Sequence, residues 1–219
     1  MTTTQTAGAG WMQTYSGLQF WPLATRSESL GEIRFVDIAQ SLSNTCRYGG
    51  HTKKFYSVAQ HCVLASHMIP AEFAKWGLMH DAAEAYLGDH IRPLKTALHV
   101  RRPAALPPWM SFSRVEFELV RRIGIRFGLD GPPPLGEIEE VDLRLLMSER
   151  DALLRPCPEP WTAFDHLTPE KRAELKRKTV PILPAEPSEA RNMFCNRAVQ
   201  LGIVSFEEAF PIDDLPIPY

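Results

Sequence analysis

The segment from Ala71 to Leu87 is apolar on nearly every face of a helix, yet it carries His80, Asp81 and Glu84. A helix with apolar residues all round belongs in the interior of a protein. Burying an imidazole and two carboxylates there without partners would cost several kcal/mol, so other residues or an ion must satisfy them. The segment therefore predicts a mainly α fold in which polar groups gather around a central helix that ends at Gly88.

Helical spacing of apolar residues predicts further helices on both sides of this segment. They span residues 36–46, 57–69, 113–127, 135–154 and 188–201. Asp37 is expected to support the start of the first helix through its charge, and Arg47-Tyr48-Gly49-Gly50 to end it as a C-cap and turn. Ser57 is the expected N-cap of the second helix, and Pro70 should stop it.

The connections between these helices predict loops and one small hairpin. Aromatic residues alternate loosely from Trp11 to Leu23, as in a short hairpin or an extended arm. Asp89 to Lys95 is expected to be a short irregular connection and the Pro-rich Arg101 to Trp109 a loop. We therefore expect a disordered tail at 1–10, an N-terminal arm or hairpin at 11–35, a helical core at 36–155 and a C-terminal helical extension packing on the core at 156–219.

The composition favours a soluble globular protein. The 219 residues are 44% hydrophobic and 23% charged, which is ordinary for that class. A formal net charge of −2 offers no bulk basic field for duplex nucleic acid. No apolar run is long enough to cross a membrane, and residues 1–10 lack a signal-peptide pattern, so we expect a cytoplasmic protein.

The cysteine spacing predicts free thiols. Cys46, Cys62, Cys157 and Cys195 include no C-x-x-C pair, so neither a structural zinc knuckle nor a disulfide framework is expected. Cys46 and Cys62 lie in apolar helical contexts and are expected to be small buried side chains.

Four side chains in and around the central segment have the composition of a metal site. His61 belongs to the expected helix before His80-Asp81, and Asp142 belongs to the expected helix at 135–154. Facing helices of a bundle can bring such residues together. Two imidazoles and two carboxylates suit one divalent transition metal, and we expect cobalt, manganese, zinc or iron. Glu84 lies one turn after His80, where its carboxylate can orient a water molecule or take its proton.

This order of a histidine, a His-Asp pair and a later aspartate resembles the HD-domain phosphohydrolase superfamily. The resemblance is closest to its nucleotidase branch, the bacterial 5′-deoxynucleotidases and the phage dATP triphosphohydrolases. It implies that residues 36–155 form an HD-domain helical bundle with a metal site between helices. The residues that carry it are Cys46-Arg47-Tyr48-Gly49-Gly50-His51, Tyr56-Ser57-Val58-Ala59-Gln60-His61, the run from His80 to Asp89, Arg92-Pro93-Leu94-Lys95 and Asp142-Leu143-Arg144.

The resemblance also implies a role for each matching residue. The metal ligands that it implies are His61, His80, Asp81 and Asp142. Glu84 matches the catalytic acid that handles the water or its proton, and Arg47 matches a phosphate-contacting arginine, which suits its bidentate guanidinium. Tyr48 stands where an aromatic residue flanks the base or sugar, although the deoxynucleotidases have Trp there. Asp89 matches an acid near the sugar 3′-hydroxyl, and Lys95 is a candidate for contacting further phosphates.

The implied activity is hydrolysis of a (deoxy)nucleotide by water attack on phosphorus, with Mg²⁺ able to accompany the substrate phosphates. Whether a monophosphate or a triphosphate is hydrolysed stays open at this point. A non-catalytic HD-type nucleotide-binding regulatory module is the alternative. A cyclic-nucleotide phosphodiesterase is less favoured, because only His90 and His99 are spare histidines nearby. Members of the nucleotidase branch tend to form homo-oligomers, so a homodimer or larger assembly is expected.

Several of these residues also have structural explanations. Arg47 could cap the first helix, Asp89 could form a turn, and Lys95 could be a surface lysine. His51 is either a loop brace or a site residue. Acids in the same helix that could replace Asp142 as ligand are Glu139, Glu140 and Asp151.

Overall fold

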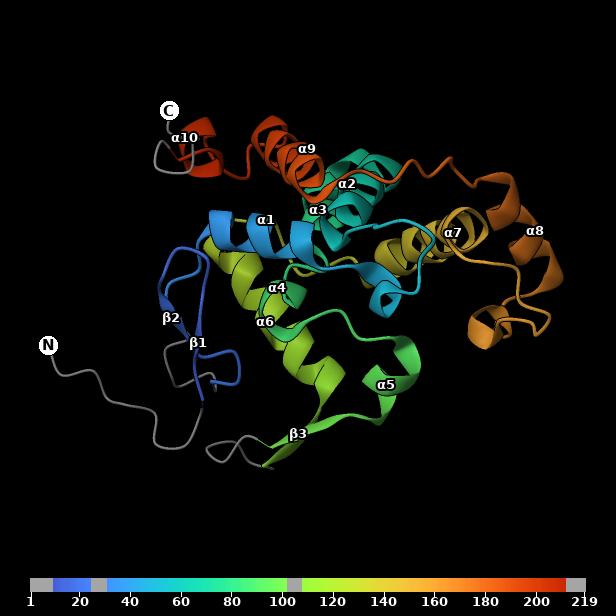
Figure 1. Cartoon of the computed structure of the whole chain (residues 1–219), viewed down its shortest axis with the longest axis horizontal. Helices are drawn as coiled ribbons and strands as arrows, with labels where there is room; N and C mark the ends of the chain where they lie inside the picture. The colour runs from blue at the N-terminus through green and yellow to red at the C-terminus, as the bar shows by residue number, and fades with distance from the viewer. Residues whose placement is uncertain (1–9, 25–30, 102–107, 212–219) are drawn as a thin grey trace, which may run out of the picture.

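The computed structural model describes residues 10–24, 31–101 and 108–211, and this part of the chain is mainly helical (Figure 1). The helical fold class predicted from the sequence is confirmed. The predicted tail at 1–10 lies outside the described residues except for Gly10. The longer helices, each at a predicted position, are α1 (Phe35–Asn44), α2 (Val58–Met68), α6 (Phe112–Arg126), α7 (Leu135–Leu153) and α9 (Pro187–Gln200).

The predicted start of α2 is confirmed, because the Ser57 side chain accepts a hydrogen bond from the backbone N–H of Gln60. The predicted end of α1 is wrong. The helix stops at Asn44 with an extended Thr45, so Arg47–Gly50 does not cap it. Arg47–Gly50 instead forms the separate short segment η1, in which Tyr48, Gly49 and Gly50 have positive φ angles that interrupt right-handed helical winding. Asp37 lies in the first turn of α1, as expected, and its carboxylate also accepts hydrogen bonds from the backbone N–H and the hydroxyl of Ser16.

The central apolar segment is not the single helix that its sequence predicts. It is divided into η2 (Ala71–Phe73), α3 (Ala74–Met79) and α4 (Glu84–Leu87), with residues 80–83 forming a turn. In this turn the N–H groups of Ala82 and Glu84 donate to carbonyls three residues back, so the chain is wound more tightly than an α-helix. The His80 ring also bonds the Gly77 carbonyl, at 2.9 Å from Nδ1. These local hydrogen bonds compete with the α-helical pattern and break the helix at the His-Asp pair.

Two small antiparallel hairpins flank the helices. Strands β1 (Met12–Gln13) and β2 (Gln19–Phe20) form the first, which confirms the hairpin alternative for the N-terminal arm. Strands β3 (His99–Arg101) and β4 (Trp109–Ser111) form the second, so the ends of the predicted Pro-rich loop are paired strands. Residues 102–107 of that loop lie outside the described residues.

The prediction of an irregular connection at 89–95 is wrong in part, because α5 (Arg92–Ala97) begins within this range. Pro93 lies in the first turn of α5, where a missing N–H breaks no helical hydrogen bond, so it favours the helix rather than limiting it.

The C-terminal extension is helical, as expected. It contains η3 (Thr162–Phe164), α8 (Pro169–Arg177), α9 and the unpredicted short α10 (Phe206–Ala209). Helix α9 packs on α1 and α2, and α8 packs on α7 (Figure 1). A small apolar cluster fixes α8 and η3 to α7 through Leu143, Met147, Phe164 and Leu175.

Helix α2 lies between the two larger apolar clusters. On one side Val58, Ala59, Cys62 and Val63 join the cluster that includes residues of α1, α3, α6 and α9. On the other side Ala65 joins residues of α7. Each fully buried large aliphatic side chain contributes roughly 1.5–3 kcal/mol. This burial fixes α2, α3 and α7 relative to one another, and these elements carry the candidate site.

The cysteines are all free, as expected. Cys62 and Cys195 are buried, and Cys157 is exposed. Cys46 differs from the expectation, since it is half-buried outside any helix and forms a β-bridge with Ser57. In the described ranges, none of the helices has the length and apolar character needed to cross a bilayer.

Candidate metal centre

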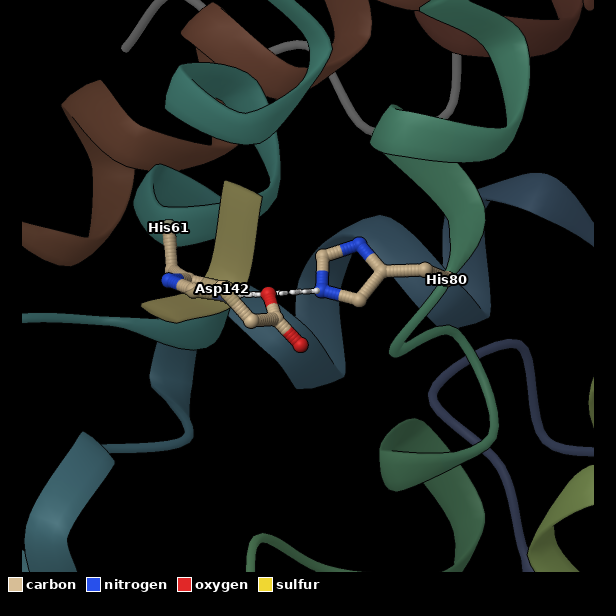
Figure 2. A group of neighbouring side chains, drawn as sticks. All are labelled: His61, His80 and Asp142. Atoms are coloured by element: carbon tan, nitrogen blue, oxygen red, sulfur yellow. Dashed lines mark hydrogen bonds and ion pairs between the residues drawn. The ribbon is translucent and has the colours of Figure 1, made fainter. Parts of the chain in front are cut away.

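Three side chains from different elements converge on one point. His61 comes from α2, His80 from the turn after α3, and Asp142 from α7. The Nε2 atoms of the two histidines are 3.3 Å apart. Asp142 Oδ1 lies 3.3 Å from His61 Nε2 and 3.2 Å from His80 Nε2. Figure 2 shows the Asp142 carboxylate directed at both rings, so the three side chains form a group that could hold a metal ion.

Asp81 adds a fourth ligand atom. Its Oδ2 lies 3.2 Å from His80 Nε2 and 3.6 Å from His61 Nε2. A tetrahedral ion with bonds of about 2.1 Å holds its ligand atoms about 3.4 Å apart. The spacings among His61, His80 and Asp142 fit this value, and Asp81 lies at a comparable distance from both imidazoles.

The hydrogen bonds on the far side of each ring also fit a metal. His80 Nδ1 must be a donor, because its partner is the Gly77 carbonyl. His61 Nδ1 donates to Glu149 Oε1 at 2.7 Å. In neutral rings both Nε2 atoms then present lone pairs to each other and to the buried Asp142 Oδ1, which has no hydrogen-bond partner within the described chain. A cation satisfies such a set of acceptors, and Nδ1 donors of this kind are typical of metal-ligating histidines.

The charges of the group lead to the same conclusion. Burial alone would raise the pKa values of Asp81 and Asp142, but the neighbouring His80 and His61 outweigh it and hold both below the usual range. Burial alone would lower the pKa of His80, but Asp81 and Asp142 raise it well above its usual value. The site thus attracts positive charge, and a divalent ion can displace the protons that the imidazoles would otherwise hold.

Glu149 is a central residue of the site that the sequence predictions missed. It is fully buried on α7, and its carboxylate accepts hydrogen bonds from four residues. Its donors are His61 Nδ1 at 2.7 Å, the Tyr48 hydroxyl at 2.6 Å, the Tyr56 hydroxyl at 3.0 Å and Arg47 Nε at 3.2 Å. Burial opposes its ionisation, but Arg47 and His61 outweigh burial and lower the pKa of Glu149 to about 2. An ionised Glu149 therefore fixes the ring orientation of His61 and the position of Arg47 together.

One sequence signal could have identified Glu149. It lies seven residues after Asp142, two turns along α7 and on the same face of the helix. An acid at that spacing from a proposed ligand is a candidate partner for a ligating histidine.

Arg47 lies beside the ligand group and does not cap α1. Its Nη2 atom pairs with Glu149 Oε2 at 3.2 Å, and its Nη1 atom lies 3.7 Å from Asp81 Oδ2. The next residue, Tyr48, has a φ of 58° and is the only non-glycine residue with positive φ in the described ranges. Such a conformation costs on the order of 1–3 kcal/mol and persists where the surroundings fix it. The hydrogen bond from the Tyr48 hydroxyl to Glu149 provides that restraint.

Glu84 is buried next to the ligand group. Its Oε1 atom accepts a hydrogen bond from Lys95 Nζ at 3.3 Å, and its Oε2 atom has no partner within the described chain. Burial, reinforced by Asp81 and Asp89, raises the pKa of Glu84 well above its usual value. Lys95 is not a free surface lysine, since it also pairs with Glu116 Oε1 at 2.8 Å.

An open cavity of about 640 Å³ lies over the ligand group. Every predicted site residue except His80 lines it. His51 does not line it and is exposed. The lining residues that the sequence singled out are Arg47, Tyr48, His61, Asp81, Glu84, Asp89, Lys95 and Asp142.

The alternative ligands are placed less favourably. Cys62 forms a second possible group with His80 and Asp81, but burial raises the pKa of its thiol, and a neutral thiol is a poor ligand. His90 lines the cavity with its ring bonded to the Leu87 carbonyl, and His99 is exposed. The acids that rivalled Asp142 lie in no candidate ligand group of the described ranges: Glu140 pairs with Lys171, Asp151 pairs with Arg150, and Glu139 is exposed.

Comparison with known proteins identifies two similar chains, both described as uncharacterized. YfdR of Escherichia coli (strain K12) is 34% identical over 187 residues, which cover 85% of this chain and 92% of YfdR. A protein of Rhodobacter capsulatus is 30% identical over 112 residues, which cover 47% of this chain and 52% of that protein. No protein-family model matches the chain.

Proposed function

The chain belongs to the same family as YfdR of Escherichia coli, and we propose that it is a metal-dependent phosphohydrolase acting on (deoxy)nucleotides. On this proposal residues 36–155 form an HD-domain bundle. The observation that carries the proposal is the convergence of His61, His80, Asp81 and Asp142 beneath an open cavity. Such a site on facing helices suits metal-assisted hydrolysis of a phosphate ester.

The four ligands would hold cobalt, manganese, zinc or iron. An ion of this kind polarises a phosphoryl oxygen and lowers the pKa of a water molecule. Arg47 borders the cavity with its Nη1 group beside Asp81, where its planar donors can bind and orient phosphate oxygens. Lys95 lines the same cavity and offsets the charge of Glu84 and Glu116.

Glu84 has the properties of the proton-transfer residue. Its unpartnered Oε2 can take the proton that water loses as its oxygen bonds to phosphorus. The same carboxyl can then give that proton to the leaving oxygen as the scissile P–O bond breaks. Burial and the neighbouring Asp81 and Asp89 raise the pKa of Glu84, so this carboxyl holds a proton more strongly than an exposed glutamate does.

The test is to incubate the protein, loaded separately with Co²⁺, Mn²⁺, Zn²⁺ or Fe²⁺ and with added Mg²⁺, with deoxy- and ribonucleoside mono- and triphosphates. We expect release of phosphate from a monophosphate or of tripolyphosphate from a triphosphate. The variant Glu84→Gln should lower kcat by about 10²–10⁴-fold while metal content is unchanged. Absence of turnover with every metal and nucleotide would contradict the proposal, and nucleotide binding without turnover would indicate the regulatory module instead.

A further inference from the structure

One wall of the cavity is apolar and comes largely from outside the predicted core. Leu143 and Leu146 of α7 line it together with residues 160–163, which precede and begin η3. Trp161 has the largest side chain in this wall and is partly exposed. The cavity is thus charged where the metal ligands lie and apolar along this side.

Trp161 lies next to the charged end of the cavity. Its ring centroid is 6.3 Å from that of Tyr48, with the two planes tilted by 58°. Tyr48 directly follows Arg47, and its hydroxyl bonds the same Glu149 that holds Arg47. An aromatic surface therefore begins beside the arginine proposed to bind phosphate.

The position of Trp161 is fixed by packing on α7. Trp161, Leu146 and Ala163 pack against the small cluster that joins α7 to η3 and α8. Leu146 lies four residues after Asp142, on the same face of α7. The metal ligand and the apolar wall are thus held at a constant separation by one helix.

We propose that Trp161 binds the planar base of the substrate, while the phosphate lies at Arg47 and the metal ligands. This inference rests on the proposed function and specifies its substrate as a phosphate ester that carries an aromatic base. The cavity of about 640 Å³ has the size usual for small-molecule sites. A sugar phosphate without a base would leave the apolar wall in contact with water.

The test is calorimetric binding of the four deoxynucleoside monophosphates and of 2-deoxyribose 5-phosphate to the metal-loaded full-length protein carrying Glu84→Gln, in which slow turnover leaves the nucleotides intact, with and without the Trp161 substitutions. We expect Trp161→Ala to weaken binding of at least one nucleotide by about tenfold, as for loss of a base–aromatic stack. Its affinity for 2-deoxyribose 5-phosphate should be unchanged. Trp161→Phe should restore most of the nucleotide affinity, and Trp11→Ala is the matched control because Trp11 is 52% exposed and does not line the cavity.

The two proposals fail in different ways. Equal nucleotide affinity with and without Trp161→Ala would overturn the role of Trp161, whether or not the wild type turns over nucleotides. If Trp161→Ala weakened binding of the nucleotides and of the base-free sugar phosphate equally, the proposed role would also be overturned, because Trp161 would then affect the whole site. A tenfold loss confined to nucleotides, together with a wild type that shows no turnover, would support Trp161 and contradict only the hydrolase.

Discussion

At the scale of single residues, Glu149 organises the site. One buried carboxylate accepts hydrogen bonds from His61, Arg47, Tyr48 and Tyr56. It therefore couples a candidate metal ligand, a phosphate-binding candidate and a strained backbone position. Its neutral analogue Gln would keep the shape of the side chain but would replace one acceptor oxygen with a donor amide.

We expect Glu149→Gln to lower metal affinity by about 10–100-fold, because His61 loses the partner that fixes its tautomer and orientation. Removing the charge opposite buried Arg47 should also lower the free energy of unfolding by about 3 kcal/mol. Isothermal titration with Zn²⁺ and urea unfolding in EDTA measure the two effects. The matched control is Glu139→Gln on the exposed face of α7, and a similar metal affinity in both variants would contradict this role.

Glu149 also predicts a specific sensitivity to acid. Its pKa of about 2 in the folded protein lies below the ordinary value of 4.5, so the unfolded chain binds more protons between these pH values. The stabilisation is therefore complete above about pH 4.5 and is lost as the pH falls toward 2. In metal-free urea titrations, the stability difference between wild type and Glu149→Gln should shrink over this window. A difference that stays constant with pH would show that the charge of Glu149 contributes nothing.

At the scale of secondary-structure elements, the contact between α2 and α3 sets the distance between the two histidines. Gly77 allows this contact, because a Cβ there would lie 2.8 Å from Ile69 Cγ2 and 2.9 Å from Ser66 Cα. The Gly77 carbonyl also bonds the His80 ring. Close packing and ligand orientation therefore depend on the same residue.

Gly77→Ala should push α3 away from α2 and thereby weaken Zn²⁺ binding. The same change should lower the free energy of unfolding by about 1–3 kcal/mol. The control is Gly136→Ala in α7, where an added Cβ meets no atom within 4 Å. Calorimetry of metal binding and thermal unfolding of both variants give the comparison. A destabilised Gly77→Ala protein with wild-type Zn²⁺ affinity would mean that this contact does not position His80.

Sequence periodicity predicted the long helices because each has a sustained apolar stripe or distinct ends, as in α2 with Ser57 and Pro70. It could not predict the break between α3 and α4, since His80 to Ala83 shows no glycine or proline and the break depends on local hydrogen bonds. The helix α5 was missed because Pro93 also fits a loop. The metal-ligand candidates follow from residue type and order, whereas Glu149 and Trp161 act through tertiary contacts that periodicity does not encode.

At the scale of the whole molecule, the candidate metal site joins parts of the chain that are distant in sequence. His61 precedes α5 and α6 in the sequence and Asp142 follows them, yet His61 Nε2 and Asp142 Oδ1 are 3.3 Å apart. Any ion that binds the folded site but not the unfolded chain stabilises the whole fold. Removing the metal should therefore lower the Tm at which the whole fold unfolds.

Adding Zn²⁺ at a hundredfold excess over its Kd should raise the free energy of unfolding by about 2.7 kcal/mol. For a chain of this size that corresponds to a Tm increase of about 5–10 °C, reversed by EDTA. Asp142→Ala should show no such increase. The same increase in wild type and Asp142→Ala would place the stabilising ion elsewhere.

The most direct measurement is an anomalous-scattering map of crystals of the full chain grown with Mn²⁺ or Zn²⁺. We expect one strong peak at about 2.0–2.2 Å from His61 Nε2, His80 Nε2 and a carboxylate oxygen of Asp142, with Asp81 completing the group. Crystals of the Asp81→Ala, Asp142→Ala double variant should lack that peak. A wild-type map with no peak between these residues, at metal concentrations that fill other sites in the crystal, would contradict the proposed metal site.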